Sequence, residues 1–210
     1  MRNPAATEPV LRKESHKDYE GSKLGMWLFL FTEILLFGGL FILYSAYRAR
    51  YPLEFHEGGQ HLNVVIGVAN TVILLTSSLT AAISITAIQK GNRRLTILCL
   101  IGTILLGAAF LVNKYLEWSG EIHRGLYPNS PVLLRHPNGD QIFFGLYYSM
   151  TGLHGIHVIA GMTVLSFMLV FVIRNKVTSS DYNKLENSGL YWHLVDVIWI
   201  FLLPLFYLAA

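Results

Sequence analysis

Five long apolar stretches alternate with short polar segments along the chain. They cover Leu24–Tyr47, Leu62–Ile88, Leu95–Leu116, Ile142–Ile173 and Leu190–Leu208. A helix needs roughly 20 apolar residues to cross the hydrocarbon layer of a bilayer. Because lipid offers no partner to backbone N–H and C=O groups, such stretches form helices and not isolated strands. The pattern therefore predicts an all-α integral membrane bundle of five transmembrane helices.

The polar segments between the apolar stretches divide the rest of the chain. Residues 1–23 form a polar N-terminal segment, and residues 24–210 form the transmembrane domain. A secretory signal peptide needs an early apolar stretch, and none precedes Leu24, so we expect the first helix to be retained. Most links are short, but Glu117–Gln141 is long and rich in Pro, Gly and Asn. This composition predicts an ordered, turn-rich loop outside the membrane.

Charged residues indicate how the helices are oriented. The chain is 53% hydrophobic and only 14% charged, against about 25% in soluble domains. If the N-terminus lies inside, the inner segments hold eleven of the 16 basic residues, and Lys114 counts with the outer side. The positive-inside rule therefore predicts an N-terminus inside and a C-terminus outside. The basic residues are scattered between apolar stretches, so the sequence does not indicate a nucleic-acid partner.

Glu33 is the most informative polar residue of the membrane part. It lies about 13 Å into the first predicted helix, near the middle of the bilayer. A charged carboxylate there costs several kcal/mol unless it is paired, hydrated or protonated. Two interpretations stay open: a carboxylate that exchanges protons, and a neutral Glu that hydrogen-bonds between helices. We predict that its partner is an imidazole of the fourth helix, preferably His157, because both groups are costly to leave unpaired.

Three histidines and an aspartate lie in the last two predicted helices. His154 and His157 are three residues apart, as are His193 and Asp196, so each pair lies on neighbouring positions of one helix face. A haem or metal site is one interpretation. We favour a polar lock that joins the helices, since the depths of these histidines match poorly for a haem held by two of them. Asp196 would then hold His193 in one tautomer or pair with a basic residue.

Further residues suit the membrane–water interfaces. Glu117 and Trp118 end the third stretch, and Trp192 lies near the start of the fifth. Trp is enriched at membrane interfaces, so we expect these residues to act as interfacial anchors. The only cysteine, Cys99, lies inside an apolar stretch and has no second cysteine with which to form a disulfide or hold a metal cluster.

Three segments together resemble the cytochrome c oxidase subunit III family. They are KLGMWLFLFTE at Lys23–Glu33, TGLHGIHV at Thr151–Val158 and YWHLVDVIW at Tyr191–Trp199. The second is close to the family stretch TGxHGxHV, and the third to WHFVDVVW. The segments follow one another in the family's order, and the resemblance extends over about residues 20–208. Glu33 corresponds to the family's buried carboxylate, which reacts with carbodiimides in relatives.

The resemblance implies a non-catalytic subunit III of a respiratory haem–copper oxidase, with the cytochrome c type favoured. Such a subunit packs beside the catalytic haem–copper subunit I, with subunit II in the same complex. Haem and copper are expected in those partners. This chain itself is expected to hold no metal, no cofactor and no catalytic residue. The subunit supports proton uptake and the stability of the catalytic subunit while oxygen is reduced to water in aerobic electron transport. Bound phospholipid, a bacterial inner (cytoplasmic) membrane and contacts with further respiratory complexes are also expected.

The sequence departs from the common family pattern in one respect. Common members have seven helices, with a two-helix unit before the helix that carries the glutamate. Five-helix members occur among both quinol oxidases and cytochrome c oxidases, so the electron donor stays open. Subunit III of a quinol oxidase and an accessory subunit of a nitric-oxide-reducing system are the alternatives. A cytochrome b or a small proton-coupled transporter is less favoured, because the sequence shows no repeats or discontinuous helices.

Overall fold

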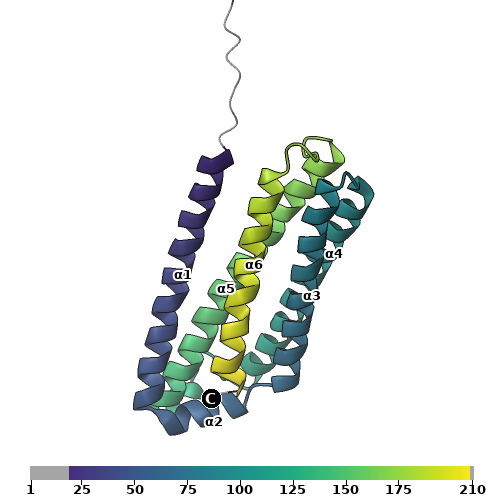
Figure 1. Cartoon of the computed structure of the whole chain (residues 1–210). Coiled ribbons are helices and arrows are strands. Elements are labelled where there is room, and N and C mark those ends of the chain that lie inside the picture. Colours follow the sequence, from purple (N-terminus) through teal and green to yellow (C-terminus); the bar gives the residue numbers. More distant parts are fainter. Residues whose placement is uncertain (1–18, 209–210) are drawn as a thin grey trace, which may run out of the picture.

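The chain folds into a bundle of long helices (Figure 1). The computed structural model describes residues 19–208, so most of the predicted N-terminal segment lies outside the described residues. Five helices are long and apolar enough to cross a membrane, which confirms the predicted all-α membrane bundle. In chain order the elements are α1 (Tyr19–Arg50), α2 (Pro52–Gln60), α3 (Val64–Gln89), α4 (Arg93–His123), the 3₁₀ turn η1 (Leu133–Arg135), α5 (Asn138–Ile173), α6 (Asn183–Leu203) and the π-helical turn η2 (Pro204–Leu208).

Most of the helices are longer than the apolar stretches that predicted them. Helix α4 continues to His123 and α5 begins at Asn138, so the predicted loop Glu117–Gln141 is wrong in its first seven and last four residues. The α-helical part of α6 begins at Asn183, seven residues before the predicted start. The helices continue beyond the apolar stretches into polar residues. Polar side chains are tolerated there, because a helix end can extend out of the hydrocarbon layer. The short helix α2 was not predicted; its Pro at the first helical turn suits a helix start.

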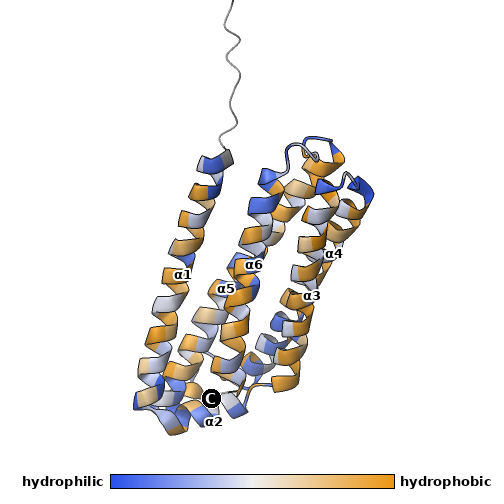
Figure 2. Ribbon diagram, viewed as in Figure 1, coloured by the Kyte–Doolittle hydropathy of each residue, from blue (hydrophilic) through white to orange (hydrophobic). Residues whose placement is uncertain are grey.

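The helices divide into a four-helix bundle and one flanking helix. Helices α3, α4, α5 and α6 pack on one another, while among these long helices α1 runs along α5 and α6 (Figure 1). The described chain begins at one end of the bundle and finishes at the other, which we call its N-terminal and C-terminal ends. Figure 2 shows hydrophobic residues along all five spans and hydrophilic residues mainly at the two ends. Which end faces the cytoplasm stays a prediction.

Aromatic rings close the C-terminal end of the bundle. The ring of Phe55 from α2 is fully buried and packs edge-on against Tyr44 of α1 and Phe143 of α5. Phe206 of η2 packs against the same Tyr44, with ring centroids 5.0 Å apart. Such edge-to-face pairs stabilise beyond the apolar area they bury. The cluster therefore joins α1, α2, α5 and η2 at this end.

Two glycines give Trp192 its place in the core. A Cβ at Gly107 of α4 or at Gly161 of α5 would lie 2.8 Å from the indole of Trp192. The Trp192 side chain is fully buried, and its indole N–H donates to the hydroxyl of Ser77 at 3.0 Å. Small residues on two helices therefore open a space inside the bundle for Trp192, which the sequence predicted as an anchor at the membrane interface.

Candidate functional site

A carboxyl–imidazole pair joins α1 to α5 in the middle of the membrane part. Oε2 of Glu33 lies 2.8 Å from Nε2 of His157. The two side chains are 14% and 13% exposed, so the pair is largely shielded by the helices that carry it. Phe37 covers the imidazole edge-on, with ring centroids 5.3 Å apart. The predicted contact between Glu33 and the fourth predicted helix is confirmed.

The second nitrogen of His157 fixes how many protons the pair holds. Nδ1 lies 2.8 Å from the carbonyl oxygen of Leu153. A carbonyl oxygen only accepts hydrogen bonds, so Nδ1 carries a proton. Nε2 and the Glu33 carboxyl then share one further proton, either as acid and neutral imidazole or as carboxylate and imidazolium. The pair can therefore exchange that proton internally without breaking its hydrogen bond.

His154 does not form the polar lock that the sequence predicted. It is completely buried, and neither ring nitrogen has a hydrogen-bond partner among the described residues. Its ring packs against Phe110 and Trp199, with centroids 5.5 and 5.3 Å away. His154 joins helices through ring packing, because its neighbours on α4 and α6 are aromatic. Within residues 19–208, no group of three or more His, Cys, Asp or Glu side chains is placed to hold a metal ion.

A second polar group lies between α3 and α6. Nδ1 of His193 is 2.5 Å from the hydroxyl of Ser78, which makes His193 an interhelix contact as predicted. Asp196 is only 3% exposed, and no hydrogen bond of ordinary geometry reaches either of its carboxylate oxygens in the described chain. The Ser78 hydroxyl is also a polar neighbour of this carboxylate. Neither partner predicted for Asp196 is found, since Ser78 takes the His193 nitrogen.

A larger polar cluster in the described chain joins Glu117 to residues that the sequence did not predict as a site. The ammonium of Lys114 donates to Glu117 at 3.1 Å, to Tyr147 at 3.0 Å and to Tyr207 at 2.9 Å. Both tyrosine hydroxyls donate to the other carboxylate oxygen of Glu117, at 2.9 and 2.5 Å. Each of the three ammonium protons thus has an acceptor. The cluster, which we call the lysine cluster, joins α4, α5 and η2.

The lysine cluster shows where Glu117, a predicted interface residue, points. Lys114 and Glu117 are 7% and 6% exposed, so both side chains face the inside of the bundle, and the depth of Glu117 in the membrane stays a prediction. Their spacing of three places them on one helix face, and a Lys inside an apolar stretch was a signal that it is buried with a partner. Trp118, the neighbouring predicted anchor, is half-buried and packs on Tyr148 with centroids 5.2 Å apart.

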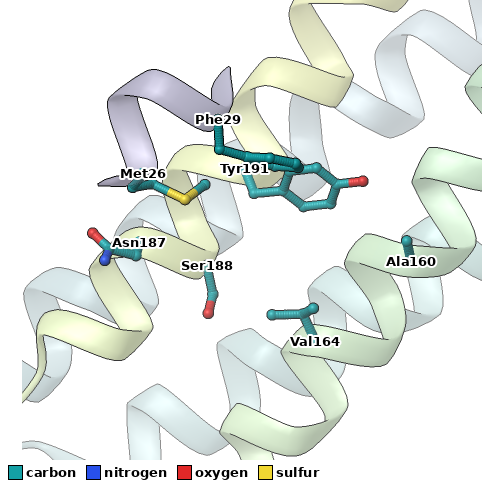
Figure 3. A pocket seen from close by; sticks show the side chains of 7 residues that line it. All are labelled: Met26, Phe29, Ala160, Val164, Asn187, Ser188 and Tyr191. Atoms are coloured by element: carbon teal, nitrogen blue, oxygen red, sulfur yellow. The ribbon is translucent and has the colours of Figure 1, made fainter. Parts of the chain in front are cut away.

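An apolar cleft lies beside the Glu33–His157 pair, towards the N-terminal end of the bundle. It has a volume of about 390 Å³ and is lined from α1, α5 and α6 by Met26, Phe29, Ala160, Val164, Asn187, Ser188 and Tyr191 (Figure 3). Asn187 marks its polar end, where the amide donates to the Ser22 hydroxyl at 3.1 Å. Nearby, Lys23 and Glu186 form an exposed ion pair at 3.1 Å. The cleft therefore combines an apolar wall with a polar, charged end.

The chain is similar in sequence to known membrane proteins. The family model described as cytochrome c oxidase subunit III matches residues 7–210. The chain is 35% identical, over 87% of its length, to cytochrome c oxidase subunit 3 of Allomyces macrogynus. It is 27% identical over 88% to a haem–copper oxidase subunit I+III of Aeropyrum pernix, and 30% identical over 89% to quinol oxidase subunit 3 of Bacillus spizizenii. The matches span 64%, 22% and 86% of those three relatives, respectively.

Proposed function

Because the chain belongs to the cytochrome c oxidase subunit III family, we propose that it is a non-catalytic subunit of a haem–copper oxidase of the cytochrome c type. Its partners are the catalytic subunit I and subunit II, which hold the haem and copper. These partners reduce oxygen to water and pump protons, and this chain supports proton uptake and the stability of subunit I during turnover.

The Glu33–His157 pair is the observation that carries this proposal. A group that supports proton uptake must hold a proton where water is scarce and release it without leaving a bare charge. The 2.8 Å contact between Oε2 and Nε2 meets this need, because the shared proton moves between two groups that remain hydrogen-bonded. The two side chains retain a little exposure, so this chain alone does not enclose the pair completely.

The apolar cleft supports the binding of a phospholipid. Its walls suit an acyl chain, since they are apolar over most of their area. Lys23 and Asn187 lie at its polar end, where a lipid headgroup carries charge and hydrogen-bond acceptors. We propose that one acyl chain lies against Phe29 and Val164, with the headgroup near Lys23. Native mass spectrometry of the complex tests this, and Val164→Trp should remove the bound lipid.

The charges at the two ends of the bundle support an orientation in the membrane. The N-terminal end of the bundle holds Lys23, Lys90, Arg93, Arg94, Arg174, Lys176 and Lys184. The C-terminal end holds Arg48, Arg50, Arg124 and Arg135. By the positive-inside rule, we propose that the N-terminal end faces the cytoplasm of a bacterial cell and that the chain lies in the inner membrane.

Purification of the native complex through a tag on this chain tests the proposal. The purified material should contain a larger haem–copper subunit, show haem absorption and consume oxygen with reduced cytochrome c. A tagged chain that purifies without haem would overturn the proposal.

A quinol oxidase is the second candidate, because one relative at 30% identity is a quinol oxidase subunit 3. The same preparation distinguishes the two donors when oxygen consumption is measured with reduced cytochrome c and with a quinol. Nitric oxide consumption by the complex, in place of oxygen consumption, would point to a nitric-oxide-reducing system.

A further inference from the structure

The α3–α6 seam, defined by Ser78, His193 and Asp196, has hydrogen-bonding groups that the described chain does not satisfy. The Ser78 hydroxyl has one proton to share between the His193 nitrogen and the Asp196 carboxylate. The imidazole of His193 is half-buried, and no hydrogen bond to its Nε2 is found within residues 19–208. Asp196 has two buried oxygens without a hydrogen bond of ordinary geometry.

This seam lies at the depth where water and lipid headgroups are farthest away. Ser78 is near the midpoint of α3, and His193 and Asp196 are near the midpoint of the span formed by α6 and η2. Lipid chains at that depth provide no hydrogen-bond donor or acceptor, so an open polar group is costly there. Large apolar side chains surround the seam and are exposed: Leu75, Leu79, Val197 and Ile200.

Exposed hydroxyl side chains in the spans can be satisfied within their own helix. The hydroxyls of Thr76, Thr163 and Ser166 each donate to the carbonyl four residues earlier, at 2.7–2.8 Å. An imidazole cannot satisfy its outer nitrogen in this way, because Nε2 points away from the helix that carries the ring. The seam therefore differs from these three sites in needing a partner from outside its helices.

We propose that the α3–α6 seam is the docking face for a transmembrane helix of the catalytic haem–copper subunit. That helix presents an amide or hydroxyl side chain at mid-depth, which bonds Nε2 of His193, while its apolar residues cover Leu75 and Val197. An amide or hydroxyl fits because it both donates and accepts, so it can bond Nε2 in either tautomer of the imidazole. The inference rests on the proposed function and adds the face through which the two subunits meet.

Retention of this chain by the oxidase tests the docking face. The complex is purified through a tag on the catalytic subunit, and the amount of this chain that remains bound is measured as detergent is raised. His193→Leu should weaken retention about threefold, the usual effect of losing one interhelix hydrogen bond in a membrane. His193→Gln keeps a hydrogen-bonding group and should retain the chain. Thr163→Val, on α5, is the matched control and should behave as the wild type.

Equal retention of the His193→Leu and Thr163→Val variants would overturn the docking face and leave the proposed function intact. If the wild-type chain does not co-purify with the tagged subunit at all, the proposed function itself fails.

Site-directed cross-linking gives a readout that does not depend on folding energy. A photoreactive probe on Val197→Cys should attach to the catalytic subunit, whereas the same probe on Val112→Cys of α4 should not. Both positions are exposed valines of the spans, so the comparison is matched. Attachment from Val112 but not from Val197, attachment of Val197 to a second copy of this chain, or no attachment from either position would each overturn the inference.

Discussion

Helix α1 and the four-helix bundle use polar residues in different ways. In the most apolar part of α1 only 11% of the residues are buried, against 50% in the corresponding part of α6. Helix α1 is attached at mid-depth by one polar contact, Glu33 with His157. The bundle instead contains the lysine cluster, where one ammonium meets three acceptors. The comparison indicates that several polar contacts lock the bundle, whereas α1 is attached at mid-depth by a single one.

Removing the ammonium from the lysine cluster should give the largest effect. Lys114→Met leaves Glu117 buried without its cation, and the loss of one partner of a buried ion pair costs about 3–5 kcal/mol. The loss of stability is measured by heating the purified complex and recording the temperature at which this chain is released. The double variant Lys114→Met with Glu117→Gln should recover much of the stability, because no buried charge remains. If Lys114→Met alone were as stable as the wild type, the lysine cluster would not lock the bundle.

Filling the space around Trp192 should give the next largest effect. A Cβ at Gly107 would lie 2.8 Å from the indole, so Gly107→Val forces the ring or the helices to move, at a cost of about 1–3 kcal/mol. Gly102 is on the same helix, and a Cβ there meets nothing within 4 Å. Gly102→Ala is therefore the matched control and should not destabilise. The same unfolding measurement compares the two variants. Equal stability would show that Trp192 is not packed tightly against Gly107.

Removing the contact on α1 should have a smaller effect on stability. Glu33→Leu leaves Nε2 of His157 without a partner, at a cost of about 1–2 kcal/mol for one interhelix hydrogen bond. Glu33→Gln should cost less, since the amide donates to the same nitrogen. Limited proteolysis near Arg50, after α1, measures how far the helix is released. If Glu33→Leu destabilises as much as Lys114→Met, polar contacts hold α1 as firmly as they hold the bundle, and the comparison fails.

The exposed ion pair at the N-terminal end of the bundle should contribute least. Lys23 and Glu186 are far more open to solvent than the pair in the lysine cluster, and exposed pairs contribute about 0–1 kcal/mol. Lys23→Met should therefore leave the unfolding temperature nearly unchanged at moderate salt. A large loss would indicate that the end of α1 is held more firmly than its exposure suggests.

The sequence predicted the spans well because each helix must cover the bilayer with apolar residues. It also predicted the contact of Glu33 with His157, since two polar groups at one depth in lipid favour each other. It did not predict that Glu117 and Trp192 are buried inside the bundle, because periodicity does not show which neighbours surround a side chain. The acceptors of Lys114 come from Tyr147 and Tyr207, 33 and 93 residues away, so only the folded chain reveals them.

Oxygen consumption by the purified complex through successive turnovers tests the central claim most directly, with Glu33→Gln compared to the wild type. The amide preserves the hydrogen bond to His157 but removes the exchangeable proton of the carboxyl. We expect the variant complex to assemble, to reduce oxygen at the wild-type rate in its first turnovers and then to lose activity sooner. A variant complex that fails at the first turnover, or one that lasts as long as the wild type, would contradict a supporting role for this pair.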